Sequence, residues 1–150
     1  VRYGFRAEDA KDLEQIYKKT RSKGFGDEVK RRIMAGAFVL KKENYQDYYI
    51  KAQKVRRIIA EQTLEIFKTH DFIMCPTAPT PPFKLGAKMD NPIAMYLSDV
   101  FTVQANLAGI PGISLHTADT KDGLPLGIQF MADRFEEAKL LAFSKQVLDK

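Results

Sequence analysis

The chain has 150 residues, and a hydrophobic content of 45% is enough for one folded domain with a real core. Its single cysteine excludes an internal disulfide, and no apolar stretch approaches the ~20 residues that cross a bilayer, so we expect a cytoplasmic protein without membrane contact. The net charge of +5 is uneven, since residues 1–70 hold 17 Lys and Arg against 10 Asp and Glu, whereas residues 71–150 hold 7 against 9. A basic first half could face RNA, but a solvated helical surface is the simpler interpretation.

The first half of the chain is predicted to be helical. The acidic residues Glu8 and Asp9 in the first turn favour a helix over residues 8–21, which the Gly-Phe-Gly run at 24–26 ends. Asp27 suits the N-cap of a second helix that runs to about residue 40, with Val29 and Ile33 among its inward residues. Residues 44–69 give a third helix, because aromatic and aliphatic side chains recur there at helical spacing without Gly or Pro. We interpret that stripe as part of the core.

The second half is predicted to build a sheet. Four prolines between Pro76 and Pro82 impose an extended, stiff loop. The last helix, predicted at 135–148, would turn inward an apolar side that includes Ala138, Leu141 and Val147. The predicted elements are a buried strand at 72–75, a helix at 93–107, strands at 113–116 and 126–130 joined by a turn at Asp122-Gly123, and a helix at 135–148. The expected fold is α/β, with a helix-rich first half and a mixed β-sheet covered by helices.

The chain offers no convincing catalytic set. None of its four serines lies in a G-x-S-x-G elbow or a Gly-Ser-Ser-Gly turn, and it has no phosphate-binding loop and no metal-ligand signature. Cys75 could be imagined beside His70 or His116, but a thiol that closes a buried strand next to proline is more simply a structural residue. We therefore predict no catalytic residue, no metal site and no cofactor in this chain.

Two charged residues are candidates for substrate recognition. Arg32 borders the apolar line of the second helix, whereas Lys30 and Arg31 are predicted to point outward. Asp99 is one acid in a nearly uncharged segment, residues 95–112. A guanidinium suits a carboxylate and an acid suits an ammonium, so the pair could hold the two ends of an α-amino acid. The alternative is an internal salt bridge or two separate surface charges.

Two short runs are informative beyond their secondary structure, the proline run Pro76-Thr-Ala-Pro-Thr80 and the Ala-Gly-Ile-Pro run that ends at Pro111. Both resemble runs shared by the carboxy-terminal part of the amidase-signature family. The Glu28-Val-Lys-Arg-Arg-Ile33 and Met95-Tyr-Leu-Ser-Asp99 runs resemble the tRNA-dependent branch of that family in particular. The resemblance extends over essentially the whole chain, as one partial amidase domain with a helical part at about 1–70 and a sheet-forming part at about 71–150.

The resemblance implies a function that the residues alone do not show. The branch comprises glutaminase subunits, which release ammonia from glutamine so that Glu-tRNA(Gln) or Asp-tRNA(Asn) is amidated in a complex with two further subunits. A partner subunit would use ATP and Mg, and misacylated tRNA would be reached through the complex. In this branch the arginine matching Arg32 holds the α-carboxylate of glutamine, and the acid matching Asp99 holds its α-amino group.

The resemblance also implies that the nucleophilic serine belongs to an amino-terminal segment that this sequence does not contain. The start at Val1, without methionine, agrees with the tail of a longer protein. We therefore expect this chain alone to be inactive. Two other interpretations remain open, a fragment of an amidase that acts on another amide, and a basic helical module that binds RNA.

Overall fold

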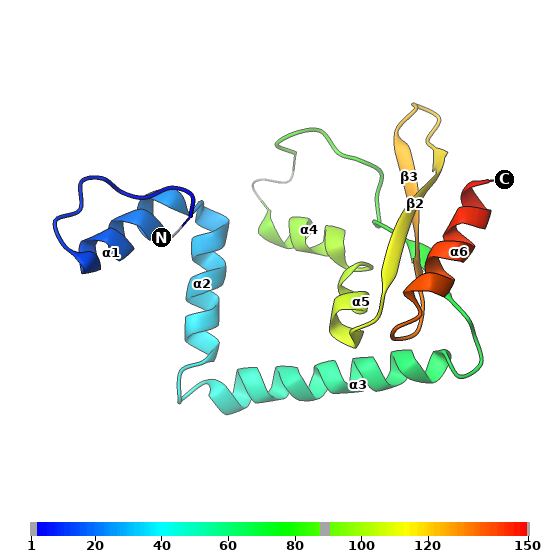
Figure 1. Ribbon diagram of the computed structural model, residues 1–150, viewed down its shortest axis with the longest axis horizontal. Helices are drawn as coiled ribbons and strands as arrows, with labels where there is room; N and C mark the ends of the chain where they lie inside the picture. Colours follow the sequence, from blue (N-terminus) through cyan, green and yellow to red (C-terminus); the bar gives the residue numbers. More distant parts are fainter. Residues whose placement is uncertain (1–2, 88–90, 150) are drawn as a thin grey trace. The chain divides into compact units, whose positions relative to one another are not determined.

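The computed structural model describes residues 3–87 and 91–149, so the opening residues Val1 and Arg2 lie outside the described residues. The chain divides into two compact units, residues 1–53 and 54–150, and each is described here by itself (Figure 1). The three strands of the described residues all follow residue 71, as predicted, whereas the boundary between the units falls within a helix. No helix of the described ranges combines the length and the apolar content of a bilayer-crossing segment.

Helix α1 (Leu13–Gly24) begins later than predicted. Asp12 is its N-cap, and the Asp12 carboxylate accepts a hydrogen bond from the backbone N–H of Gln15 at 2.7 Å. Asp9, which we expected in the first turn, lies before the helix and forms ion pairs with Lys19 and Lys23, each at 3.1 Å. Hydrogen bonds from these two ammonium groups lower the pKa of the Asp9 carboxyl. Asp9 therefore ties the preceding loop to one face of α1.

Helix α2 (Asp27–Val39) ends close to the predicted residue, but its apolar face is not covered. None of its residues is buried, and Val29 and Ile33, which we expected to point inward, are exposed. The predicted N-cap is displaced by one residue, because Gly26 takes that position and Asp27 lies in the first turn. A helical period alone indicates which face is apolar, but not whether anything packs on it.

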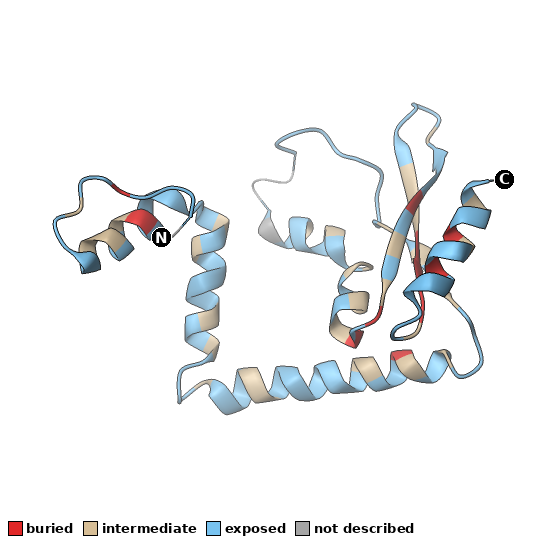
Figure 2. Ribbon diagram, viewed as in Figure 1, coloured by how far each residue is buried: buried red, intermediate tan, exposed pale blue. Residues whose placement is uncertain are grey.

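The third predicted helix is present as two continuous segments, a π-helical turn η1 (Tyr45–Ile50) followed by α3 (Lys51–Ile66). In η1, Tyr45 stacks on Tyr49 with ring centroids 5.0 Å apart. The interpretation of the aromatic and aliphatic stripe as core is wrong for most of its length, because Tyr48 and Val55 are exposed and the buried residue of α3 is Thr63 (Figure 2).

The sheet of the second unit has three antiparallel strands in the order β1-β3-β2. The strands are β1 (Ile73–Pro76), β2 (Gly112–Asp119) and β3 (Pro125–Met131). The predicted turn at Asp122-Gly123 joins β2 to β3, with Gly123 at a φ of 76°, which glycine adopts without strain. The α/β class is confirmed, and the described strand pairs are all antiparallel.

Helices cover both faces of this sheet. Phe130 and Leu115 point to one face, where they pack with Leu140 of helix α6 (Glu137–Leu148). Met131 points to the other face, where it packs with Ala108 of helix α5 (Val103–Ala108) and with the carboxy-terminal half of α3. Central strand β3 is therefore covered on both sides, and its last three residues are buried (Figure 2).

Two elements of this unit differ from their predictions. The strand at 72–75 is an edge strand on which exposure alternates, with Met74 exposed, because an edge strand is covered less than a central one. The helix predicted at 93–107 is broken into α4 (Pro92–Tyr96), a 3₁₀ turn η2 (Leu97–Asp99) and α5.

The inward face of α6 is also not the predicted one. Leu141 and Ala138 are exposed, whereas Leu140 and Ser144 are buried. Val147, from the predicted side, does pack against the core. The contact that decides the phase is aromatic, since Phe143 stacks on Phe72 with ring centroids 4.3 Å apart.

Candidate functional site

A pocket of about 400 Å³ lies in the second unit, between the proline run and the β2–β3 hairpin. Its floor comes from hairpin residues, its outer wall from the loop after β1, and one further residue, Ser98, comes from η2. The lining residues are Pro76, Thr77, Ala78, Thr80, Pro81, Pro82, Phe83, Ser98, Ser114, Leu115, His116, Pro125, Leu126 and Gly127. The lining is mostly apolar with a few hydroxyl groups, which is typical of small-molecule sites.

Thr77 fastens the proline loop to the hairpin. Its backbone N–H donates to the Gly127 carbonyl at 3.0 Å, and its hydroxyl donates to the Ser114 hydroxyl at 3.1 Å. A Cβ at position 127 would lie 2.9 Å from the Thr77 hydroxyl, so this close approach requires glycine. Because the prolines keep the loop extended, these two bonds hold the outer wall of the pocket at a fixed distance from the strands.

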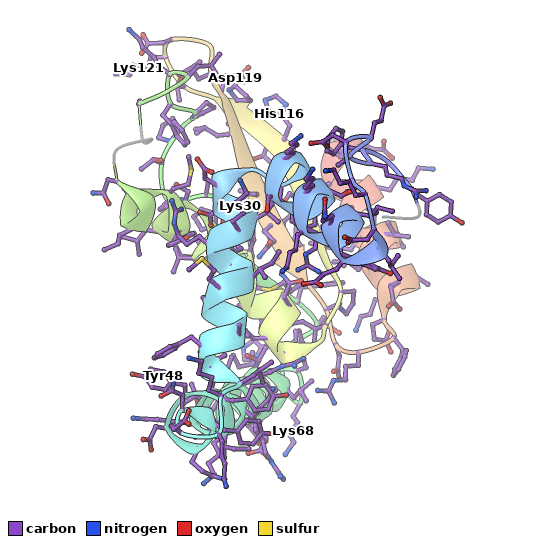
Figure 3. The ribbon with its side chains drawn as sticks, turned by 90° about the vertical axis from the view of Figure 1, so that its left-hand side faces the viewer. Lys30, Tyr48, Lys68, His116, Asp119 and Lys121 are labelled. Carbon is purple, nitrogen blue, oxygen red and sulfur yellow. The ribbon has the colours of Figure 1, made fainter. Side chains whose placement is uncertain are left out.

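His116 adds a polar group to the pocket lining, near the hairpin end of β2 (Figure 3). Its Nε2 lies 2.8 Å from a carboxylate oxygen of Asp119, and both side chains are more than half exposed. The β2 strand has an irregular register between His116 and Ala118, which lets the two side chains approach each other. This pair orients the imidazole ring but leaves it in contact with solvent.

Asp99 follows Ser98 in the chain and ends the 3₁₀ turn η2. Its backbone carbonyl accepts hydrogen bonds from the N–H and the hydroxyl of Thr102, at 3.1 and 3.0 Å. The Asp99 residue is exposed, and among the described residues its carboxylate has no hydrogen bond or ion pair. The backbone at Asp99 is thus fixed, while the carboxylate remains open to a cationic ligand.

Four long side chains hold the segment that follows Asp99 against the rest of the unit. The Gln129 amide donates to the Phe101 carbonyl at 3.1 Å, and the Gln104 amide donates to the Thr63 hydroxyl at 3.2 Å. At the end of α5, Arg56 donates to the Leu107 carbonyl and Arg134 to the Ala108 carbonyl, at 3.2 and 3.0 Å. These two guanidinium groups satisfy carbonyls that a helix end leaves without partners.

Arg32 lies on α2 in the other unit, exposed rather than turned inward. Its Nε contacts a Glu28 oxygen at 2.9 Å, and Arg31 contacts the second oxygen of the same carboxylate. The predicted difference between the two arginines is wrong, since the Arg32 side chain is 67% exposed and the Arg31 side chain 55%. The two candidate clamp residues therefore come from different units, and their common role in binding stays a prediction.

Cys75 and the histidines form no catalytic pair. The half-buried Cys75 thiol lies 3.6 Å from the Gln129 amide, whereas His70 Nδ1 contacts the Thr69 hydroxyl at 2.8 Å. Across residues 3–87 and 91–149, no group of three His, Cys, Asp or Glu side chains is close enough to hold a metal ion. Sequence reasoning missed the Thr77–Ser114 pair and Gln129, although a glutamine inside the apolar run 126–131 was a visible signal.

Comparison with known proteins agrees with the family resemblance. The amidase family model matches residues 1–141. The A subunit of glutamyl-tRNA(Gln) amidotransferase from Thiobacillus denitrificans is 53% identical over 146 residues, which are 97% of this chain and 30% of that protein. The protein of the same name from Syntrophus aciditrophicus is 56% identical over 141 residues, 94% of this chain and 29% of that protein.

A solved structure also matches. The crystal structure of the A subunit of glutamyl-tRNA(Gln) amidotransferase from Thermotoga maritima is 42% identical, with a TM-score of 0.61, and the match covers 84% of this chain and 27% of that one. The chain therefore spans about a third or less of the length of the relatives it matches.

Proposed function

The chain belongs to the amidase family, and we propose that it is a segment of the glutaminase subunit of a tRNA-dependent amidotransferase. The single observation that carries the proposal is identity above 50% to two proteins of that name across nearly the whole chain. In the complete enzyme, a serine elsewhere in the subunit would attack the side-chain amide of glutamine and release ammonia. The partner subunits would use ATP and Mg to amidate Glu-tRNA(Gln), or Asp-tRNA(Asn), in the cytoplasm.

In this proposal the segment supplies specificity for glutamine rather than chemistry. Arg32 holds the α-carboxylate of the substrate and Asp99 holds its α-amino group. Asp99 is suited to this role because its backbone is fixed by Thr102 while its carboxylate is open. A charge-assisted hydrogen bond of this kind is worth roughly 1.5–3 kcal/mol.

The contact of Arg32 with Glu28 does not compete strongly with substrate. It is an exposed i,i+4 pair on a helix surface, and such pairs contribute only about 0.3–0.5 kcal/mol. A bidentate contact with the substrate carboxylate is stronger than this pair, so the Glu28 contact does not by itself prevent Arg32 from binding glutamine.

The test uses the full-length subunit in its complex, with residues in the present numbering. Arg32→Ala and Asp99→Ala should each lower kcat/KM for glutamine by about ten- to a hundredfold, mainly through KM. Amidation of tRNA with added ammonium as the nitrogen source should stay nearly unchanged, because that route bypasses glutamine. Arg32→Lys should rescue only in part, since an ammonium cannot form the bidentate fork.

Arg31→Ala is the matched control. Arg31 contacts the same Glu28 carboxylate from the same helix, so its loss removes a comparable exposed ion pair while the Arg32 side chain itself is kept. If Arg31→Ala raises KM and Arg32→Ala does not, the assignment of Arg32 is wrong. If the complex hydrolyses acetamide as readily as glutamine, the protein is an amidase of a different substrate and the proposal fails.

A further inference from the structure

Gln129 places an amide side chain in the most buried part of the sheet. It is 5% exposed and lies in central strand β3, where its neighbours in the chain are Ile128 and Phe130. An amide at such a position destabilises the fold unless its hydrogen bonds are satisfied, and a methionine or leucine would fill the same space without that requirement. The presence of glutamine therefore calls for a reason beyond packing.

The contacts of the Gln129 amide lead toward the Asp99 turn. Its Nε2 donates to the backbone carbonyl of Phe101 at 3.1 Å, and it also lies 3.6 Å from the Cys75 thiol on the neighbouring strand. Phe101 is two residues after Asp99, in the turn that connects η2 to α5. The hydrogen bond thus joins the rigid centre of the sheet to the backbone that carries the Asp99 carboxylate.

The other hydrogen bonds described around this turn lie within it or act further along the chain. Thr102 bonds back to the Asp99 carbonyl, and this contact lies within the turn itself. The Gln104, Arg56 and Arg134 contacts act further along, on α5 and its end. Gln129 acts from the central strand β3, where it pairs with Cys75 of β1 and with Ser114 of β2. Its bond is placed to determine where the turn lies above β3.

We propose that Gln129 is a positioning residue that fixes Asp99 for the α-amino group of glutamine. The inference rests on the proposed function, because it assumes that Asp99 contacts that ammonium. Loss of the Gln129 hydrogen bond leaves the Phe101 carbonyl without this donor, and the turn relaxes away from the sheet. The Asp99 carboxylate then moves relative to a substrate that is held at its other groups, and a shift of about 1 Å is enough to weaken such a contact.

The experiment compares glutamine with glutaramate, which is glutamine without its α-amino group, in the full-length protein within its complex. Gln129→Met and Gln129→Leu each keep a side chain of similar size and remove both donors. Each variant should lower kcat/KM for glutamine by about tenfold, through KM rather than kcat, and lower that for glutaramate by less than about threefold. Gln104→Met is the control, because it removes a comparable amide contact from α5 without touching the Phe101 carbonyl.

The outcomes separate this inference from the proposed function. A wild-type complex that does not prefer glutamine to glutaramate overturns both. A wild-type preference together with an equal loss on both substrates in the Gln129 variants overturns the inference alone, since a general structural defect does not distinguish the substrates. It is also overturned if Gln104→Met gives the same selective loss, or if neither Gln129 variant folds. A selective loss in either folded variant supports it.

Discussion

The phase of helix α6 gives the sharpest prediction about stability, because two adjacent leucines have opposite surroundings. Leu140 is 3% exposed and packs with Leu115, Phe130 and Ala132, whereas Leu141 is 59% exposed. Truncation of a buried leucine to alanine removes its transfer free energy and leaves a cavity, at a cost of about 2–5 kcal/mol. The core beside Leu140 contains two rigid phenylalanines that pack around Phe143, so little collapse into the cavity is expected, and we expect a loss of about 3 kcal/mol for Leu140→Ala.

The assay is urea unfolding of the 150-residue chain followed by far-UV circular dichroism. With a slope of roughly 1–2 kcal/mol per molar urea, Leu140→Ala should lower the unfolding midpoint by about 1.5–3 M. Leu141→Ala is the control and should change the free energy of unfolding by less than about 0.5 kcal/mol. If Leu141→Ala costs as much as Leu140→Ala, α6 presents a different face to the sheet and the packing described here is wrong.

Two further predictions concern activity and pH. The chain by itself should release ammonia from glutamine only at background rate, because none of its serines lies in a G-x-S-x-G elbow or a Gly-Ser-Ser-Gly turn. Clear ammonia release that survives Ser114→Ala and Cys75→Ala would contradict this prediction. The hydrogen bond and charge of Lys139 lower the pKa of the Asp71 carboxyl, so a titration followed by NMR should place it below its usual value, and Lys139→Met should raise it. Because the folded-state pKa of Asp71 is depressed, this ion pair contributes stability above the unfolded-state pKa, and that contribution is lost as the pH falls through the folded-state pKa. An Asp71 pKa that does not respond to Lys139→Met would show that the pair does not form in solution.

Local sequence signals determined which segments are regular and where several of them end. The Gly-Phe-Gly run ends α1, and Gly123 provides the turn between β2 and β3, because glycine adopts backbone angles that other residues avoid. The amphipathic patterns located α2, the continuous helix made of η1 and α3, and α6 to within a few residues. The family was also readable from the sequence, since the resemblance of its short runs agrees with the family model that matches residues 1–141.

Packing, by contrast, was decided by tertiary structure. Helical periodicity alone predicted the wrong inward face of α6. Apolar residues lie on more than one face of this helix, and only the stacking of Phe143 on Phe72 selects the face that packs on the sheet. The same limit applies to Arg31 and Arg32, which helical spacing predicted to differ and which both contact Glu28.

The surroundings of the candidate site follow from contacts between segments that lie far apart in the chain. Thr77 meets Ser114 across 37 residues, and Gln129 meets Phe101 across 28. The sequence by itself singled out Asp99 as an acid in an apolar segment, but not the amide that holds its turn. A hydrogen bond between distant residues leaves no periodic signal in either segment, since it depends on strand register and on how a turn lies above the sheet. Only the folded chain brings those two groups within 3.1 Å.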